Sequence, residues 1–177
     1  MPEQTKISWL RYVWLTYWSK PVHQRWLLRA IRSQGVQNIV HVGVGDGQFA
    51  SRMIDVAQRY SNQRVCYTGI DHFEGSRKGV LSLRNAHVLL KSHGAKVKLI
   101  PGDVYSAFAR FANELTNTDL LLIGETDEEA LQRSWLYMPR MLHDKSLVCR
   151  QNGLTLEKVD PAWINERANQ RQVRRAA

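Results

Sequence analysis

Short apolar segments alternate with longer amphipathic segments through most of the chain. The apolar segments have the length and composition of buried strands, and the segments between them repeat apolar side chains at helical spacing. Strands are predicted at residues 38–42, 65–70, 97–100, 119–123 and 146–149, with a further short strand at 154–159, and helices at residues 49–60, 80–92, 107–115 and 128–142. Strands separated by helices form parallel βαβ units with right-handed crossovers. We therefore predict an α/β fold, a doubly wound, mostly parallel sheet of about five to six strands covered by helices on both faces.

The first 35 residues have a helical pattern rich in aromatic side chains. Apolar residues recur at steps of three and four over residues 7–18, as Ile7, Leu10, Val13, Trp14, Tyr17 and Trp18. Pro21 stands where a second helix would begin, and Gly35 where it would end. We predict that residues 1–35 form N-terminal helices that pack on the domain or on a partner, with a homodimer as one outcome. Residues 36–177 are predicted to form the α/β domain.

A glycine-rich turn follows the first predicted strand. Gly43, Gly45 and Gly47 alternate with other residues, and helix-forming sequence follows at once. Glycine lets the backbone turn sharply and lets a ligand approach closely, and a helix start offers free N–H groups. The turn is therefore either a nucleotide cradle or a tight turn without a ligand. A dinucleotide fingerprint needs its third glycine one residue later, where this chain has Gln48.

Further polar residues stand at the carboxyl ends of later strands, where open parallel sheets bind ligands. Asp71 and His72 follow the second strand, and Asp103 and Val104 follow the third. A carboxylate at Asp71 can accept both hydroxyls of a ribose, or it can cap the loop. Asp103 can likewise accept from an amine, or act as an ordinary turn residue.

An acidic segment follows the fourth predicted strand. Thr126 and Glu129 have the spacing of a capping box, and Asp127 and Glu128 fall where a helix dipole favours carboxylates. Glu125 precedes these residues and has no such role in the helix start, so it is the candidate catalytic acid or base.

The overall charge of the chain is +9, and the excess lies near its two ends. Residues 1–35 carry six Lys and Arg against one Glu, and the tail after Asp160 carries four Arg against one Glu. Such ends are compatible with nucleic acid, anionic lipid or an acidic substrate, or simply with an arginine-rich surface. No apolar run is long enough to span a bilayer, the spacing of Cys66 and Cys149 suggests no metal site, and a cytoplasmic location is expected.

Four segments together resemble the motifs of class I S-adenosylmethionine-dependent methyltransferases, and most closely the group acting on small molecules and sugars. They span residues 42–47, 68–75, 99–103 and 118–123, within a resemblance that covers about residues 36–152. The resemblance implies S-adenosylmethionine as cofactor; from the spacing of the histidines, no metal is expected. It implies that the glycine turn lies beside the methionine part of S-adenosylmethionine. It also implies that Asp71 binds the ribose and that Asp103 and Val104 contact the adenine. His41, two residues before the first glycine, occupies the place of an acid that helps to hold the methionine ammonium in that family, and His72 adjoins Asp71.

Other departures from that family keep alternatives open. Glu125-Thr126-Asp127 replaces a segment that usually contains a histidine, and Gln151-Asn152 replaces the acidic pair of metal-dependent members. The residues after position 152 are too few for the two strands and helix that complete the family's fold, so any substrate lid is expected from the N-terminal helices or another subunit. The first hypothesis is a methyltransferase acting on a small-molecule or nucleic-acid acceptor. The alternatives are a binding or structural module that has lost catalysis, an RNA-associated protein using its basic ends and, last, a dinucleotide oxidoreductase.

Overall fold

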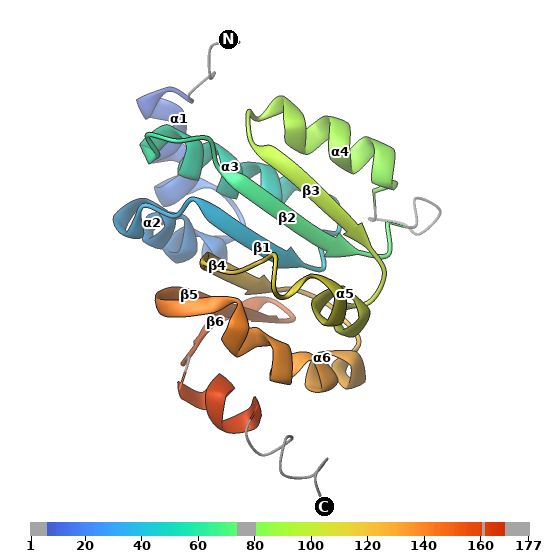
Figure 1. Cartoon of the computed structure of the whole chain (residues 1–177). Coiled ribbons are helices and arrows are strands. Elements are labelled where there is room, and N and C mark those ends of the chain that lie inside the picture. The colour runs from blue at the N-terminus through green and yellow to red at the C-terminus, as the bar shows by residue number, and fades with distance from the viewer. Residues whose placement is uncertain (1–6, 74–80, 161, 169–177) are drawn as a thin grey trace, which may run out of the picture.

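Six strands form one sheet in the order β3-β2-β1-β4-β5-β6 (Figure 1). The structure is a computed structural model, and it describes residues 7–73, 81–160 and 162–168. The first five strands are parallel, and β6 pairs antiparallel with β5. The strands are β1 (Asn38–Val42), β2 (Cys66–Asp71), β3 (Lys96–Pro101), β4 (Thr118–Ile123), β5 (Leu142–Asn152) and β6 (Thr155–Val159). The predicted doubly wound, mostly parallel sheet is therefore confirmed.

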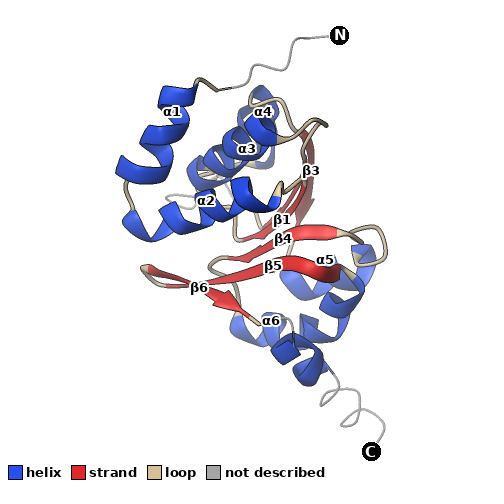
Figure 2. Ribbon diagram, turned by 90° about the vertical axis from the view of Figure 1, so that its left-hand side faces the viewer, coloured by secondary structure: helices blue, strands red, loops and turns tan. Residues whose placement is uncertain are grey.

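Helices cover both faces of this sheet, as Figure 2 shows with α1 to α4 on one side and α5 and α6 on the other. The helices of the first face are α1 (Trp9–Val13), η1 (Trp14–Trp18), η2 (Val22–Gln24), α2 (Arg25–Gln34), α3 (Gln48–Tyr60) and α4 (Leu83–Ser92). Those of the second face are α5 (Val104–Phe111), α6 (Glu128–Ser134) and η3 (Trp135–Arg140). Residues 162–168 form a last helical segment, in which Ile164 joins the core of the second face.

Alternate residues of the central strands enter the two separate cores. In β1, Ile39 belongs to the core under α1 to α4, whereas Val40 and Val42 belong to the core under α5 and α6. In β4, Leu120 and Leu122 face the first core, and Leu121 and Ile123 the second. Because successive side chains of a strand point to opposite faces, a run that is apolar throughout is buried on both sides.

The N-terminal helices pack on α3 through apolar and arginine contacts. Leu15 and Leu27 are buried in the same core as the α3 side chains. Arg11 pairs with the buried carboxylate of Asp55 on α3, with 2.9 Å between Nη2 and Oδ2. The guanidinium of Arg32 lies over the ring of Tyr60, 4.9 Å from its centroid. Part of the positive charge of this segment therefore holds the helices in place.

Several predicted boundaries differ from the structure. The helix predicted at residues 107–115 begins at Val104, because the Asp103 side chain caps it, and ends at Phe111. The helix predicted at residues 128–142 ends at Ser134 and continues as the 3₁₀ helix η3, which contains Pro139. Proline lacks the N–H that an α-helix needs, which accounts for the change. The fifth strand, predicted at 146–149, extends over residues 142–152.

The chain order of the strands reverses between β1 and β4. From β1 the chain continues outward to β2 and β3, whereas β4 lies on the other side of β1 and continues to β5. Open α/β sheets bind ligands outside the carboxyl ends of their strands at such a reversal. This edge is therefore where a site is expected.

Candidate functional site

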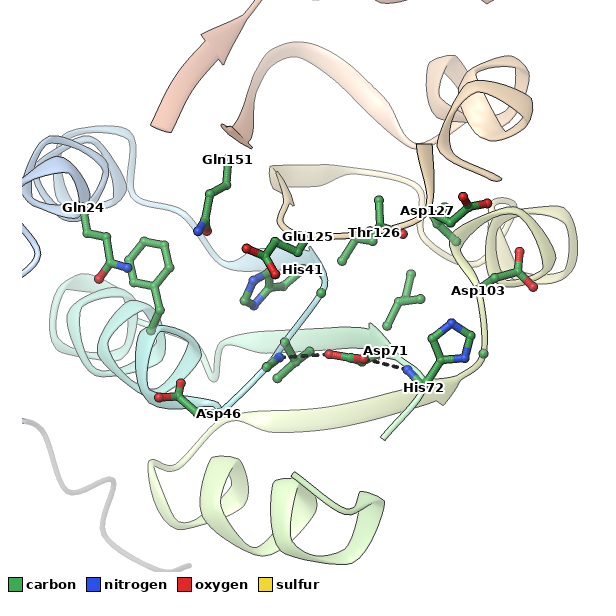
Figure 3. Close-up of a pocket in the computed structure, with 18 residues that line it drawn as sticks. Gln24, His41, Asp46, Asp71, His72, Asp103, Glu125, Thr126, Asp127 and Gln151 are labelled. Carbon is green, nitrogen blue, oxygen red and sulfur yellow. Dashed lines mark hydrogen bonds between the residues drawn. The ribbon is translucent and has the colours of Figure 1, made fainter. Parts of the chain in front are cut away.

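A pocket of about 730 Å³ opens at the carboxyl ends of the strands, at the reversal between β1 and β4 (Figure 3). Its volume is in the range of small-molecule and cofactor sites. Its lining comes from six parts of the chain that are far apart in sequence: Gln24; His41 to Asp46 and Phe49; Ile70 to His72; Gly102 to Val104; Glu125 to Asp127; and Gln151. The pocket therefore brings together all the predicted site residues except Gly47.

The glycine turn adopts a backbone that other residues rarely adopt. Gly43, Gly45 and Gly47 have φ values of 75°, 60° and 71°. A Cβ on Gly43 would lie 2.5 Å from the carbonyl oxygen of Glu125, so the end of β1 and the segment after β4 are in close contact. Gly47 is the N-cap of α3, and a Cβ there would meet Leu81 at 2.9 Å rather than the pocket. Gly43 and Gly45 line the pocket, whereas the geometry of Gly47 serves the packing of α3 on α4.

Asp71 braces this turn from the end of β2. Its Oδ2 accepts a hydrogen bond from the Gly45 N–H at 2.9 Å, and its Oδ1 accepts one from the His72 N–H at 2.7 Å. Both oxygens are thereby fixed in position, and a carboxylate oxygen can accept more than one hydrogen bond. His72 is exposed and also lines the pocket.

Asp103 has a structural role at the start of α5. Its two oxygens accept hydrogen bonds from the Ser106 N–H at 2.9 Å and the Ser106 Oγ–H at 2.6 Å. Partial burial raises the pKa of Asp103, but the hydrogen bonds from Ser106 and from nearby backbone N–H groups together outweigh it and leave the pKa below its ordinary value. The carboxylate is therefore charged at neutral pH. The adjacent Val104 is buried and offers an apolar contact at the same edge.

His41 lies at the base of the pocket, and its side chain is only 3% exposed. Its Nδ1 lies 2.8 Å from the hydroxyl oxygen of Tyr67, which comes from β2 and is fully buried. Burial lowers the pKa of His41 to about 4, and the charge of Asp71 opposes this only in part. The imidazole is therefore neutral at physiological pH.

The acidic segment after β4 is arranged differently from the predicted capping box. The N-cap of α6 is Asp127 rather than Thr126, because the Asp127 side chain accepts a hydrogen bond from the Ala130 N–H at 2.8 Å. Carboxylates and hydroxyls are both good N-caps, and the backbone places the carboxylate at the first extended residue before the helix. Glu128 lies in the first turn as predicted, and Glu129 lies there with it. Glu125 is exposed at the pocket lining, outside the helix.

The charges of the lining are opposite in sign to the net charge of the chain. Five carboxylates line the pocket, at Asp46, Asp71, Asp103, Glu125 and Asp127. Among the described residues that line it there is no Lys or Arg. The pocket therefore suits a cationic or neutral polar ligand and opposes a phosphate or a pyrophosphate.

Sequence reasoning did not identify two residues at the pocket edge, Gln24 and Phe49. Gln24 lies on η2 and reaches the pocket because the N-terminal helices pack on α3, where Arg52 donates to the Lys20 carbonyl at 2.7 Å. That placement depends on tertiary packing, which has no local signal. Phe49 follows the glycine turn directly, and its position there was a usable signal.

No group of three or more His, Cys, Asp and Glu side chains in the described part of the chain is placed to hold a metal ion. Within the same residues, none of the helices has the length and apolar character needed to cross a membrane.

Comparison with known proteins places the fold. No protein-family model matches the chain, and no curated protein matches it. Solved structures do match it. CalS11, a TDP-rhamnose 3'-O-methyltransferase of calicheamicin biosynthesis, is 16% identical over 91% of this chain and 82% of its own, with a TM-score of 0.59.

Two further structures have the same fold. The O-methyltransferase from Bacillus cereus in complex with SAH is 14% identical, with a TM-score of 0.59 over 76% of this chain, which spans only 57% of that enzyme. A putative caffeoyl-CoA O-methyltransferase from Staphylococcus aureus is 14% identical over 83% of this chain and 69% of its own, with a TM-score of 0.55. The chain therefore has the fold of the class I S-adenosylmethionine-dependent methyltransferases.

Proposed function

We propose that this protein is an S-adenosylmethionine-dependent methyltransferase acting on a small-molecule acceptor. The observation that carries the proposal is the pocket at the strand reversal, lined by five carboxylates and, among the described residues, by no Lys or Arg. The sulfonium of S-adenosylmethionine is a cation, so this lining favours it. The same lining opposes the pyrophosphate of a dinucleotide, as does Gln48 in place of a third glycine.

The residues at the pocket fit an adenosyl group. Gly43 and Gly45 let the backbone approach the ligand, and Asp71 faces the pocket with both oxygens already oriented by backbone N–H groups. We assign the ribose hydroxyls to Asp71, and the adenine to the edge formed by Asp103 and Val104. His72 adjoins this edge. Gly47 contributes by shaping the start of α3.

The methyl acceptor would lie toward Glu125, where Gln24 and Gln151 complete the lining (Figure 3). The ring of Phe49, which packs against His41, lines the same pocket. S-Adenosylmethionine supplies an activated methyl group, so that alignment of the acceptor provides much of the rate. Glu125 is the candidate base for a hydroxyl or amine acceptor. The amides of Gln24 and Gln151 can each donate and accept hydrogen bonds, which suits an uncharged polar molecule as the methyl acceptor.

Binding of the cofactor is the first test. Calorimetry with S-adenosylmethionine and S-adenosylhomocysteine should give saturable binding, and Asp71→Ala should weaken it by roughly fivefold or more, since a hydrogen bond to a charged group is lost. Asp144→Ala is the matched control, because Asp144 is exposed and outside the pocket lining. Absence of binding at millimolar ligand would refute the proposal.

A methyltransferase-fold module without catalysis is the second candidate, favoured by the neutral, buried His41 at the base of the pocket. The two candidates differ in turnover of bound cofactor. Methyl transfer from labelled S-adenosylmethionine into an extract of small molecules should fall at least tenfold in Glu125→Gln with unchanged cofactor affinity, if the protein is an enzyme. Cofactor binding without any transfer by the wild-type protein would support the module.

The N-terminal helices expose an apolar surface that we propose to be a homodimer interface. Its large side chains are 50% to 72% exposed: Trp9, Leu10, Trp14, Tyr17, Trp18 and Val22. An apolar surface of this kind marks an interaction site. Arg11 and Arg32 nearby are engaged by Asp55 and by tyrosine rings, which reduces the repulsion between two like surfaces. Light scattering should detect a dimer that Trp14→Ser with Trp18→Ser dissociates, and a wild-type monomer would overturn this.

Nucleic acid remains an alternative partner for the basic ends, and residues 169–177 of the tail lie outside the described residues. Steep loss of RNA binding between 50 and 200 mM salt would support it. We also propose a cytoplasmic location, because Cys66 and Cys149 are both free thiols. Cell fractionation tests that location.

A further inference from the structure

The side chain of His41 is the buried polar group at the base of the pocket. His41 lies on β1, opposite Gly69 of β2 and Leu122 of β4. It is 3% exposed, yet it is part of the pocket lining. Its ring packs edge to face against the rings of Phe49 and Tyr67, with 6.5 Å and 6.2 Å between ring centroids. These two contacts fix the orientation of the imidazole. The group is therefore rigid, and it is placed to contact whatever fills the base of the pocket.

The hydrogen bond to Tyr67 determines which ring nitrogen carries the proton. Among the described residues, His41 is the hydrogen-bond partner of the Tyr67 hydroxyl, which is fully buried. If Nδ1 carried the proton, the hydroxyl hydrogen would be left without an acceptor in the interior, which is costly. The hydroxyl therefore donates to Nδ1. A neutral imidazole then carries its hydrogen on Nε2.

The protonation state of the ring supports this arrangement. Burial lowers the pKa of His41 to about 4, so the ring stays neutral over the physiological range. Burial likewise raises the pKa of the Tyr67 hydroxyl well above 10, so that hydroxyl keeps its hydrogen. Nε2 is the ring nitrogen left to face the pocket, as a donor without charge. Such a group attracts a hydrogen-bond acceptor and opposes an ammonium, which has only donors.

We propose that the Nε2–H of His41 holds the carboxylate of the ligand's amino-acid group. This inference rests on the proposed function, since the ligand in question is S-adenosylmethionine. The start of α3, which follows the glycine turn with Phe49 in its first turn, places the positive end of a 13-residue helix beside the same region. That partial charge favours a carboxylate as well. The ammonium of the same group is then directed toward the carboxylates that line the pocket.

This arrangement makes His41 a specificity-determining residue. A ligand that lacks the carboxylate loses its partner on Nε2 and presents its ammonium to an N–H donor. A ligand that keeps the carboxylate retains the contact whether or not its sulfur is charged. The pocket is therefore expected to select for the carboxylate rather than for the ammonium.

Calorimetry at pH 7.5 with four probes tests the inference: S-adenosylmethionine, decarboxylated S-adenosylmethionine, S-adenosylhomocysteine and methylthioadenosine. The wild-type protein should bind the decarboxylated compound at least tenfold more weakly than S-adenosylmethionine. His41→Asp should reduce that ratio below threefold, since a carboxylate repels the ligand's carboxylate and attracts its ammonium. Tyr67→Phe should also reduce the ratio of the affinities for S-adenosylmethionine and its decarboxylated form. Without the Tyr67 hydroxyl, Nδ1 of His41 can carry the ring proton in place of Nε2. His87→Asp on α4 is the matched control, exposed and outside the pocket lining, and should keep the wild-type ratio.

The outcomes separate this inference from the proposed function. No binding of any probe refutes both. Binding of S-adenosylmethionine and its decarboxylated form with equal affinity by the wild-type protein refutes the inference alone. If His41→Asp does not fold, long-range ¹H–¹⁵N spectra of the wild-type protein decide the matter. They should show His41 neutral with its proton on Nε2, and a proton on Nδ1 or a charged ring at pH 7 would overturn the inference.

Discussion

Acidification should destabilise this protein through His41. The perturbation is a change of pH from 7.5 to 4.5, applied to the wild-type protein and to His41→Asn. In the folded protein, burial lowers the pKa of His41 from its ordinary 6.5 to about 4. The unfolded chain therefore binds a proton between these two values that the folded protein does not bind. Stability then rises with pH through this window and is lost as the pH falls below 6.5.

The magnitude follows from the two pKa values. A group with a pKa of 6.5 unfolded and about 4 folded contributes almost nothing to the pH dependence at pH 7.5. Its protonation in the unfolded chain lowers the free energy of unfolding by about 1 kcal/mol at pH 5.5 and by about 2–3 kcal/mol at pH 4.5. Carboxylates elsewhere also change stability over this range, so the wild-type curve alone does not isolate the effect of His41.

His41→Asn provides the necessary comparison. Asparagine does not titrate, and its side-chain oxygen can take the place of Nδ1 as the acceptor for the Tyr67 hydroxyl. Urea unfolding followed by tryptophan fluorescence gives the free energy of unfolding of both proteins at each pH. The difference between them should change by about 2–3 kcal/mol between pH 7.5 and pH 4.5 in favour of the variant. A difference that is constant with pH would refute a neutral, buried His41.

Two further substitutions test the packing around the site. Gly43→Ala should lower the free energy of unfolding by about 2 kcal/mol or more, because its φ is 75° and its Cβ would lie 2.5 Å from the Glu125 carbonyl oxygen. Gly35→Ala, with φ 64° and no atom within 4 Å of the added Cβ, should cost only about 1 kcal/mol, and equal losses in urea unfolding would contradict the close contact. Asp55→Asn should cost about 1–3 kcal/mol, because it removes the buried carboxylate that pairs with Arg11, and limited proteolysis should then cut the first helix faster. An unchanged cleavage rate would mean that this pair does not hold the helix.

The architecture was predictable because its signals are local. Each central strand is a short apolar run, and β1 at residues 38–42 has the boundaries that its pattern predicts. The predicted ends of helices and strands were wrong where a side-chain cap or a tertiary contact determines where the element begins or ends. Asp103 caps α5 so that it begins at Val104, three residues before the apolar pattern does. The strand β5 begins at Leu142 and continues through the polar residues His143 to Lys145, which have no strand pattern.

The candidate site was predictable only in part, for a related reason. Strand ends meet at one edge of a parallel sheet, so Asp71, Asp103 and Glu125 could be grouped from the order of elements alone. The sequence pattern predicts Thr126 as the N-cap of α6, whereas the structure has Asp127, because both residues are good caps and sequence does not determine which is the last extended residue. Gln24 reaches the pocket because the N-terminal helices pack on α3, and no local sequence pattern indicates that position.

The partner of His41 depends on strand register. Ile39 pairs with Tyr67 and His41 with Gly69, so the Tyr67 side chain and the His41 side chain are diagonal neighbours on one face of the sheet. Sequence alone places both residues on strands but leaves the register between β1 and β2 open. The tautomer of the imidazole follows from that contact and its neutral state from burial, so both could be derived only from the structure.

The net charge of the chain is a poor guide to what its pocket binds. The chain is strongly basic, yet the carboxylates that line the pocket meet no Lys or Arg within the described lining. At physiological ionic strength charges are screened over about 8 Å, so a bound ligand responds mainly to the residues around it. Arginines such as Arg11 are, in turn, committed to carboxylates and rings of the N-terminal helices. The local acidity of the pocket, rather than the basic total, is therefore the property that relates this fold to a cationic ligand.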